Sequence, residues 1–140
     1  MKKFAFFSAI LALLTCHLQA QQAVSPPHRI VFQLQSADTM AHKSLMKQLN
    51  NIATVSPDSE LEVVCHGPGL QMLLQSKSRV ADKIPGLVGK HVTFVACEFS
   101  MQEQKVDRSQ LLPTVGTVPY GLLEVVSKQE AGWSYIKAGF

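Results

Sequence analysis

Several patterns that mark common functional classes are missing from this sequence. It has no Walker phosphate-binding loop, no Gly-x-Gly-x-x-Gly turn and no defensible Ser–His–Asp order, so no motif indicates a nucleotide-binding protein or a serine hydrolase. The formal net charge is only +3 and the basic residues are scattered without interleaved aromatics, which argues against nucleic-acid binding. After residue 20, no segment is long and apolar enough to span a membrane.

The N-terminus has the pattern of a secretory signal peptide. Two lysines precede an apolar run over residues 4–14, and Ala20 ends a plausible cleavage site. We therefore expect residues 1–20 to be a signal peptide, residues 21–28 to be a flexible leader, and the protein to reach the periplasm. Cys16 would leave with the signal peptide; its lipidation is a weaker alternative because no small residue directly precedes it.

The remaining residues, 29–140, alternate strand patterns with helical ones and show no repeat or low-complexity run. Short runs rich in β-branched residues predict strands at 30–34, 61–65, 92–97, 114–118 and 133–136. Helical patterns or turns separate these runs. The alternation favours a single α/β domain, with a parallel sheet covered by helices on both faces.

The stretch from Leu61 to Leu70 has the clearest functional pattern. A buried strand ends at Cys65, and the glycines that follow permit a tight turn into a helix. Such a turn presents main-chain N–H groups at the carboxyl end of a parallel strand, where open α/β sheets bind ligands. We therefore expect His66, Gly67 and Gly69 to belong to a ligand-binding site.

A second candidate is Cys97, which ends the third predicted strand. Right-handed crossovers bring it to the same edge of the sheet as Cys65 and the glycine turn. A thiol near a helix start has a lowered pKa and can act as a nucleophile, whereas a buried cysteine simply packs in the core; the spacing leaves both roles open. Glu98 is a candidate general base, with a solvated surface charge as the plainer alternative.

Two other roles for the cysteines follow from their positions. Neighbouring parallel strands lie about 4.8 Å apart, which is compatible with the disulfide Cα spacing of about 4.4–6.8 Å, so Cys65 and Cys97 could form a disulfide after export. Cys65, His66 and Cys97 also make a possible metal set, although their spacing matches no known zinc pattern. We assign no metal and no other cofactor from the sequence.

Taken together, these motifs resemble the DsrE/DsrF-like family, and in particular its exported branch. The resemblance covers nearly all of residues 29–140 and rests on Val63–Leu70, Val92–Cys97 with Ser100-Met101, Pro119-Tyr120-Gly121, and Lys128 to Ile136. It implies a three-layer α/β/α fold with a five-stranded, mainly parallel sheet, often assembled into a trimer or hexamer. It also implies a sulfur carrier or sulfurtransferase-like activity, with sulfur held as a persulfide on the cysteine after the third strand, which is Cys97 here.

A periplasmic sulfur-handling protein is therefore our first functional prediction. Cys97 would accept sulfane sulfur, the amides of Gly67 and Gly69 would hold the anionic sulfur, and Ser100 would lie at the binding rim. Cys65 replaces the residue usual in the exported branch and could act as a resolving thiol. Expected partners are sulfur donor or acceptor proteins, or small sulfur species. The alternatives are a non-catalytic module that binds a small anion or a partner protein, and a Cys/His metal-binding protein.

Overall fold

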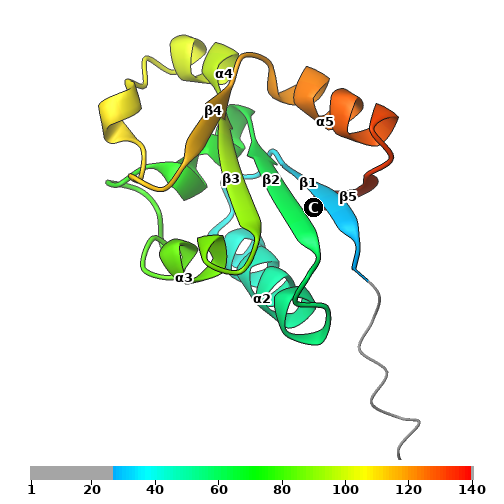
Figure 1. Cartoon of the computed structure of the whole chain (residues 1–140). Helices are drawn as coiled ribbons and strands as arrows, with labels where there is room; N and C mark the ends of the chain where they lie inside the picture. The colour runs from blue at the N-terminus through cyan, green and yellow to red at the C-terminus, as the bar shows by residue number, and fades with distance from the viewer. Residues whose placement is uncertain (1–26, 140) are drawn as a thin grey trace, which may run out of the picture.

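The computed structural model of the chain describes residues 27–139, which form a sheet with helices on both faces (Figure 1). The sheet has five strands in the order β4-β3-β2-β1-β5, and every neighbouring pair is parallel. The predicted fold class, a three-layer α/β/α arrangement, is confirmed. The predicted signal peptide, residues 1–20, and most of the predicted leader lie outside the described residues.

The strands follow the predicted runs closely. They are β1 (Arg29–Leu34), β2 (Glu60–Cys65), β3 (Val92–Cys97), β4 (Gly116–Val118) and β5 (Ser134–Ala138). The helices are α2 (Thr39–Val55), α3 (Ile84–Val88), α4 (Glu98–Glu103) and α5 (Gly121–Glu130), with 3-10 helices η2 (Gly67–Leu73) and η3 (Arg108–Gln110). Within residues 27–139, no helix has the length and apolar character that a membrane crossing needs.

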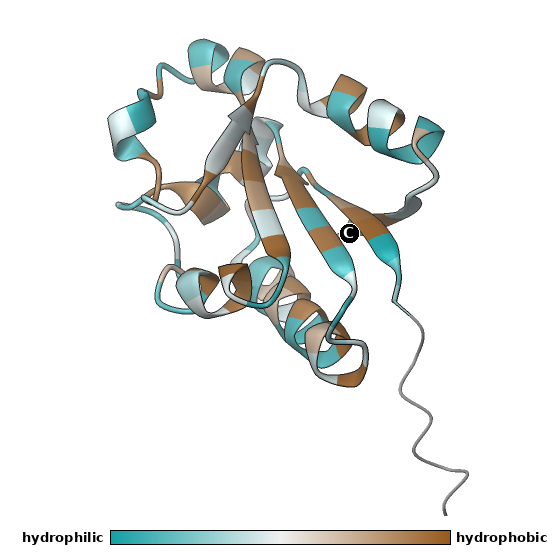
Figure 2. Cartoon of the chain, in the orientation of Figure 1, coloured by the Kyte–Doolittle hydropathy of each residue, from teal (hydrophilic) through white to brown (hydrophobic). Residues whose placement is uncertain are grey.

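The two faces of the sheet carry separate cores because side chains alternate along each strand. Figure 2 shows the central strands mostly brown, while the helices mix brown with teal, as amphipathic helices do. The larger core holds Phe32, Val63 and Phe94, together with the buried residues of α2, η2 and α3. The smaller core lies under α5 and is built from Val31, Val64, Val95 and Val125.

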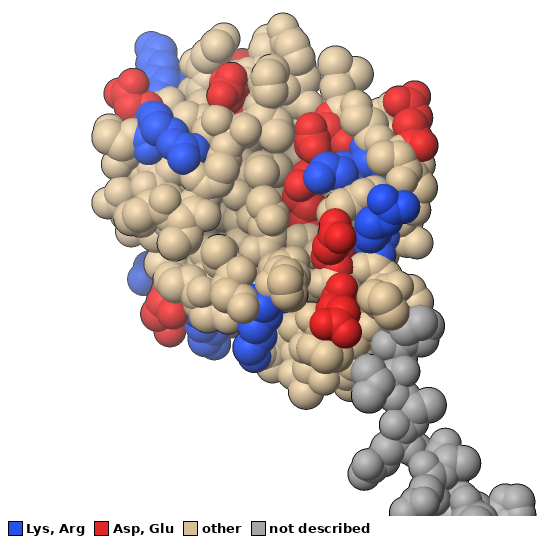
Figure 3. Space-filling view, in the orientation of Figure 1, with Lys and Arg blue, Asp and Glu red and all other residues tan. Residues whose placement is uncertain are grey.

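An ion pair on the α5 face of the sheet links α5 to β2. Nζ of Lys128 lies 2.7 Å from Oε2 of Glu62 on β2, 3.7 Å from Oε1 of Glu124, and 4.4 Å from the ring centre of Trp133. Glu62 is buried, and within the described residues its Oε1 has no hydrogen-bond partner. Acidic and basic side chains accordingly meet beside α5, at the right of Figure 3.

The glycine turn after β2 is pressed against the end of β1. A Cβ placed on Gly69 would lie 2.2 Å from the carbonyl oxygen of Leu34, so no larger residue fits there without a shift of the main chain. Gly67 has a φ of +50°, in the left-handed region that favours glycine. The two glycines therefore set the path of the chain as it leaves β2.

Candidate functional site

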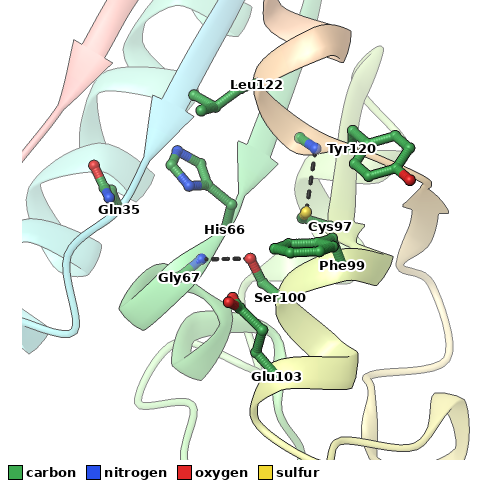
Figure 4. A pocket seen from close by; sticks show the side chains of 10 residues that line it. Gln35, His66, Gly67, Cys97, Phe99, Ser100, Glu103, Tyr120 and Leu122 are labelled. Carbon is green, nitrogen blue, oxygen red and sulfur yellow. Dashed lines mark hydrogen bonds between the residues drawn. The ribbon is translucent and has the colours of Figure 1, made fainter.

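A cavity of about 250 Å³ opens at the carboxyl ends of β1, β2, β3 and β4 (Figure 4). It lies at the edge of the sheet where open α/β folds bind ligands. The structure brings four of the predicted site residues to it, including both the thiol and the glycine turn. The lining residues are Gln35, His66, Gly67, Cys97, Phe99, Ser100, Glu103, Tyr120, Gly121 and Leu122.

Cys97 is the N-cap residue of α4 and is 4% exposed. Its Sγ accepts a hydrogen bond from the main-chain N–H of Gly121 at 3.2 Å. Burial by itself raises the pKa of the Cys97 thiol. Hydrogen bonds from the hydroxyl and N–H of Ser100, and from the N–H groups of Gly121 and Phe99, outweigh burial and lower that pKa. The arrangement favours the thiolate, which is the nucleophilic form of cysteine.

Gly121 brings the start of α5 directly onto Cys97. A Cβ on Gly121 would lie 3.1 Å from the Cβ of Cys97 and 3.2 Å from both the Cβ of His66 and Cγ1 of Val64. The absence of a side chain thus allows a main-chain N–H to reach the sulfur. Our sequence reasoning missed Gly121 as a site residue, although it follows the fourth strand at the same edge of the sheet.

The glycine turn supports the cavity without offering free amides. The N–H of Gly67 donates to Oγ of Ser100 at 2.9 Å, and its carbonyl accepts from Nε2 of Gln104 at 2.7 Å. The N–H of Gly69 donates to the carbonyl of His66 at 3.0 Å, and Gly69 does not line the cavity. The amides predicted to hold an anionic sulfur are therefore already paired within the chain, and the donor that reaches the sulfur comes from Gly121.

His66 forms the opposite wall of the cavity from Phe99 (Figure 4). Its side chain is buried, and its Nε2 lies 2.8 Å from Nε2 of Gln33 on β1. Burial lowers the pKa of the imidazole, so the ring is neutral at pH 7. Glu98, by contrast, is not brought to the cavity and lines a separate hollow with Gln102 and Arg108.

Cys65 points away from the site. In the register of the sheet Cys65 pairs with Ala96, so Cys97, one residue further on, faces the opposite side. Both thiols are free, and burial raises the pKa of Cys65 far above its usual range. Of the two possibilities left open by the sequence, the structure has free thiols and not the Cys65–Cys97 disulfide, and Cys65 is not placed to resolve a persulfide on Cys97.

The metal-binding alternative fails for the same reason. Cys65 lies in the larger core, whereas His66 and Cys97 line the cavity on the other face of the sheet. Among residues 27–139, no three His, Cys, Asp or Glu side chains come close enough together to hold a metal ion.

Exposed apolar side chains line part of the cavity and continue beyond it on α5. The rings of Phe99 and Tyr120 have centroids 6.0 Å apart, and Phe99, Tyr120 and Leu122 are all about half exposed, at 49%, 55% and 58%. Leu123 and Val126 continue this exposed apolar surface along α5. Among the described residues, Glu103 is the one member of the lining with a carboxylate, and no lysine or arginine of residues 27–139 contributes to it. We call the five apolar residues the apolar rim.

The fold and the cavity define an α/β protein with a hydrogen-bonded thiol at the carboxyl edge of a parallel sheet. Residues 28–138 match the sequence profile of the DsrE/DsrF-like family, and the chain belongs to this family. Membership indicates a function related to sulfur relay. A search of curated proteins finds no match.

Solved structures show the same fold. The chain is similar to a protein of unknown function, MTH1491, from Methanobacterium thermoautotrophicum, with a TM-score of 0.74 and 27% sequence identity over 79% of this chain and 98% of that chain. It also resembles a conserved protein of unknown function, BT1422, from Bacteroides thetaiotaomicron, with a TM-score of 0.66 and 11% identity over 78% of this chain and 93% of that chain. The second likeness shows the fold alone.

Proposed function

We propose that the protein is a periplasmic sulfur carrier that holds sulfane sulfur as a persulfide on Cys97. The observation that carries the proposal is the environment of the sulfur, which lines an open cavity and accepts a hydrogen bond from Gly121. Donors around the thiol lower its pKa despite burial, which suits a nucleophile. Family membership supports the sulfur chemistry, and the N-terminal sequence pattern supports export.

The loading step is an exchange at divalent sulfur. The Cys97 thiolate attacks the outer sulfur of a donor persulfide, R–S–SH, so that a bond forms between Sγ and that sulfur. The sulfur–sulfur bond of the donor breaks, and R–S⁻ leaves with the electron pair. In the delivery step, an acceptor thiolate attacks the outer sulfur of the Cys97 persulfide, and Cys97 leaves as thiolate. No external oxidant or reductant is consumed in either step.

The lining of the cavity favours an organic persulfide over a small dianion as the donor. A dianion such as thiosulfate would meet the carboxylate of Glu103 and, among the residues that the structure describes, no compensating lysine or arginine. The apolar surface of Phe99, Tyr120 and Leu122 suits an organic group or a side chain of a donor protein. The sulfur donors and acceptors are thus expected to be small organic persulfides and thiols, or proteins that present them.

The test is mass spectrometry after incubation with an organic persulfide or with thiosulfate. We expect the wild-type protein and Cys65→Ala to gain the mass of one sulfur atom from the persulfide, and Cys97→Ser to gain none. Thiosulfate should load the protein more slowly. Absence of any adduct at Cys97 in the wild type would refute the carrier. If Cys97→Ser then keeps the protein's ligands, the non-catalytic binding module is the better description.

We also propose that the part of the apolar rim outside the cavity, Leu123 and Val126 on α5, is covered in a homo-oligomer, a trimer or hexamer. Contiguous exposed apolar residues mark interaction surfaces, and these two residues are 60% and 46% exposed and do not line the cavity. Light scattering should give a mass above that of the monomer, and Leu123→Glu should shift it toward the monomer. Val55→Glu, at an exposed apolar position on α2, is the matched control. A monomeric wild-type protein would contradict the assembly.

A further inference from the structure

A chain of hydrogen bonds links the surface of β5 to the wall of the cavity. The hydroxyl of Tyr135 donates to Oε1 of Gln33, and Nε2 of Gln33 lies 2.8 Å from Nε2 of His66. Strand register puts Tyr135 and Gln33 on the α5 face of the sheet, because Tyr135 pairs with Val31 and Gln33 pairs with Val64, and both valines belong to the smaller core. This is also the face on which Cys97 lies.

We propose that Tyr135 and Gln33 are positioning residues that hold His66 in the tautomer with its proton on Nδ1, and that this N–H donates to the outer sulfur of a Cys97 persulfide. The first part concerns the protein alone. The second part rests on the proposed sulfur-carrier function.

The direction of the hydrogen bonds fixes the tautomer. Because Tyr135 donates to the amide oxygen of Gln33, the amide nitrogen is the group that faces His66. An amide nitrogen only donates, so Nε2 of His66 is the acceptor. Burial lowers the pKa of His66 and keeps the ring neutral, and a neutral imidazole carries a single proton. That proton is therefore on Nδ1.

The Nδ1 proton of His66 is available to a ligand in the cavity. His66 is nine-tenths buried, and within residues 27–139 the structure shows no hydrogen bond at its Nδ1. Figure 4 places the ring between Gln35 and Cys97, and the Cβ atoms of His66 and Cys97 both lie within 3.2 Å of the point that a Cβ on Gly121 would occupy. A persulfide extends the cysteine by one S–S bond, about 2.05 Å, and Cys97 and His66 both line the cavity that would hold the outer sulfur. In the proposal, the donor to this outer sulfur is the Nδ1–H of His66.

The tautomer is read from the ¹⁵N and ¹³C chemical shifts of the His66 ring by NMR. In the wild-type protein we expect a protonated Nδ1 and an unprotonated Nε2. In Gln33→Glu the carboxylate accepts only, so the proton should move to Nε2; the shifts and the loading are measured at a pH at which the ring of the variant is neutral. In Tyr135→Phe no hydroxyl holds the amide oxygen of Gln33, so the amide can turn and present its oxygen to His66. The population with the proton on Nε2 should therefore rise. Gln48→Glu, on the exposed side of α2, is the matched control and should leave His66 unchanged.

The same variants are then loaded with an organic persulfide. Losing a hydrogen bond to an anionic sulfur should lower the loading rate, or the lifetime of the adduct, by about tenfold or more in Gln33→Glu, and by less in Tyr135→Phe. A wild-type His66 protonated on Nε2 would overturn the proposal. So would unchanged loading in both variants once their tautomers have shifted. If the wild type has the expected tautomer but never forms an adduct on Cys97, the carrier function fails, the donor role falls with it, and the assignment of the tautomer stands.

Discussion

Replacing Lys128 with methionine removes the ion pair that fastens α5 to the sheet. The change leaves the buried Glu62 carboxylate without its 2.7 Å partner, while Oε1 already lacks a hydrogen bond within the described residues. Removing one partner of a buried ion pair costs about 3–5 kcal/mol. The Lys128 side chain is 23% exposed and Glu62 can take up a proton, so we expect about 2–3 kcal/mol at pH 7.

The stability that Lys128→Met loses should increase as the pH rises. Burial raises the pKa of Glu62 above its usual range, and Lys128 only partly offsets this. A raised pKa in the folded protein gives stability that is present below the unfolded pKa and is lost as pH rises through the folded pKa. Without Lys128 the folded pKa rises further, so the variant loses more stability with rising pH than the wild type does.

Urea unfolding between about pH 4 and pH 8, followed by circular dichroism, measures this difference. The free energies of unfolding should nearly coincide at the acidic end and diverge toward pH 8. Lys47→Met, at an exposed position on α2, should have little effect at any pH. The double variant Glu62→Leu/Lys128→Met should recover much of the stability, because no unpaired charge stays buried. A loss in Lys128→Met that is the same at every pH would refute the electrostatic explanation.

Three further predictions concern the thiols and the glycine turn. Ser100→Ala removes a donor to Cys97, so the pKa of that thiol should rise and its alkylation at neutral pH should slow by roughly fivefold; an unchanged rate would mean that main-chain donors suffice. Cys65 should react with the alkylating reagent only in denaturant, and native-state labelling would contradict its burial. Gly69→Ala should lose about 3 kcal/mol or more in urea unfolding, whereas Gly86→Ala, with open space at Cβ, should change stability by less than about 1 kcal/mol; equal effects would contradict the close approach.

The sequence predicts most of the fold because the three central strands, β1, β2 and β3, are largely buried. A short continuous apolar run such as Val92–Cys97 is typical of a covered parallel strand, and the structure gives that strand the same bounds. Asp38, a residue type that favours helix starts, caps α2 by accepting from the N–H of Met40. Strand bounds and helix caps depend on burial and on nearby residues in the chain, so local sequence patterns predict them.

The site was harder to predict because it depends on the directions in which side chains and main-chain N–H groups point. One residue of register decides that Cys65 faces the larger core while Cys97 faces the cavity, and the sequence does not show how the two strands align. The hydrogen-bond donor to Sγ of Cys97 is the N–H of Gly121, which is the first residue of α5 and is distant from Cys97 in the sequence. We expected free N–H groups at Gly67 and Gly69 because the first N–H groups of a helix have no partner within the helix. In the structure, these two N–H groups donate to Oγ of Ser100 and to the carbonyl of His66.

The placement of the two cysteines on opposite faces has a consequence for repair after oxidation. Within residues 27–139 there is no second thiol that Cys97 can reach, because the sheet stands between it and Cys65. If Cys97 is oxidised to a sulfenic acid, the described domain cannot rescue it by forming an internal bridge. Recovery then requires a reductant from outside the domain, arriving through the same opening that admits sulfur.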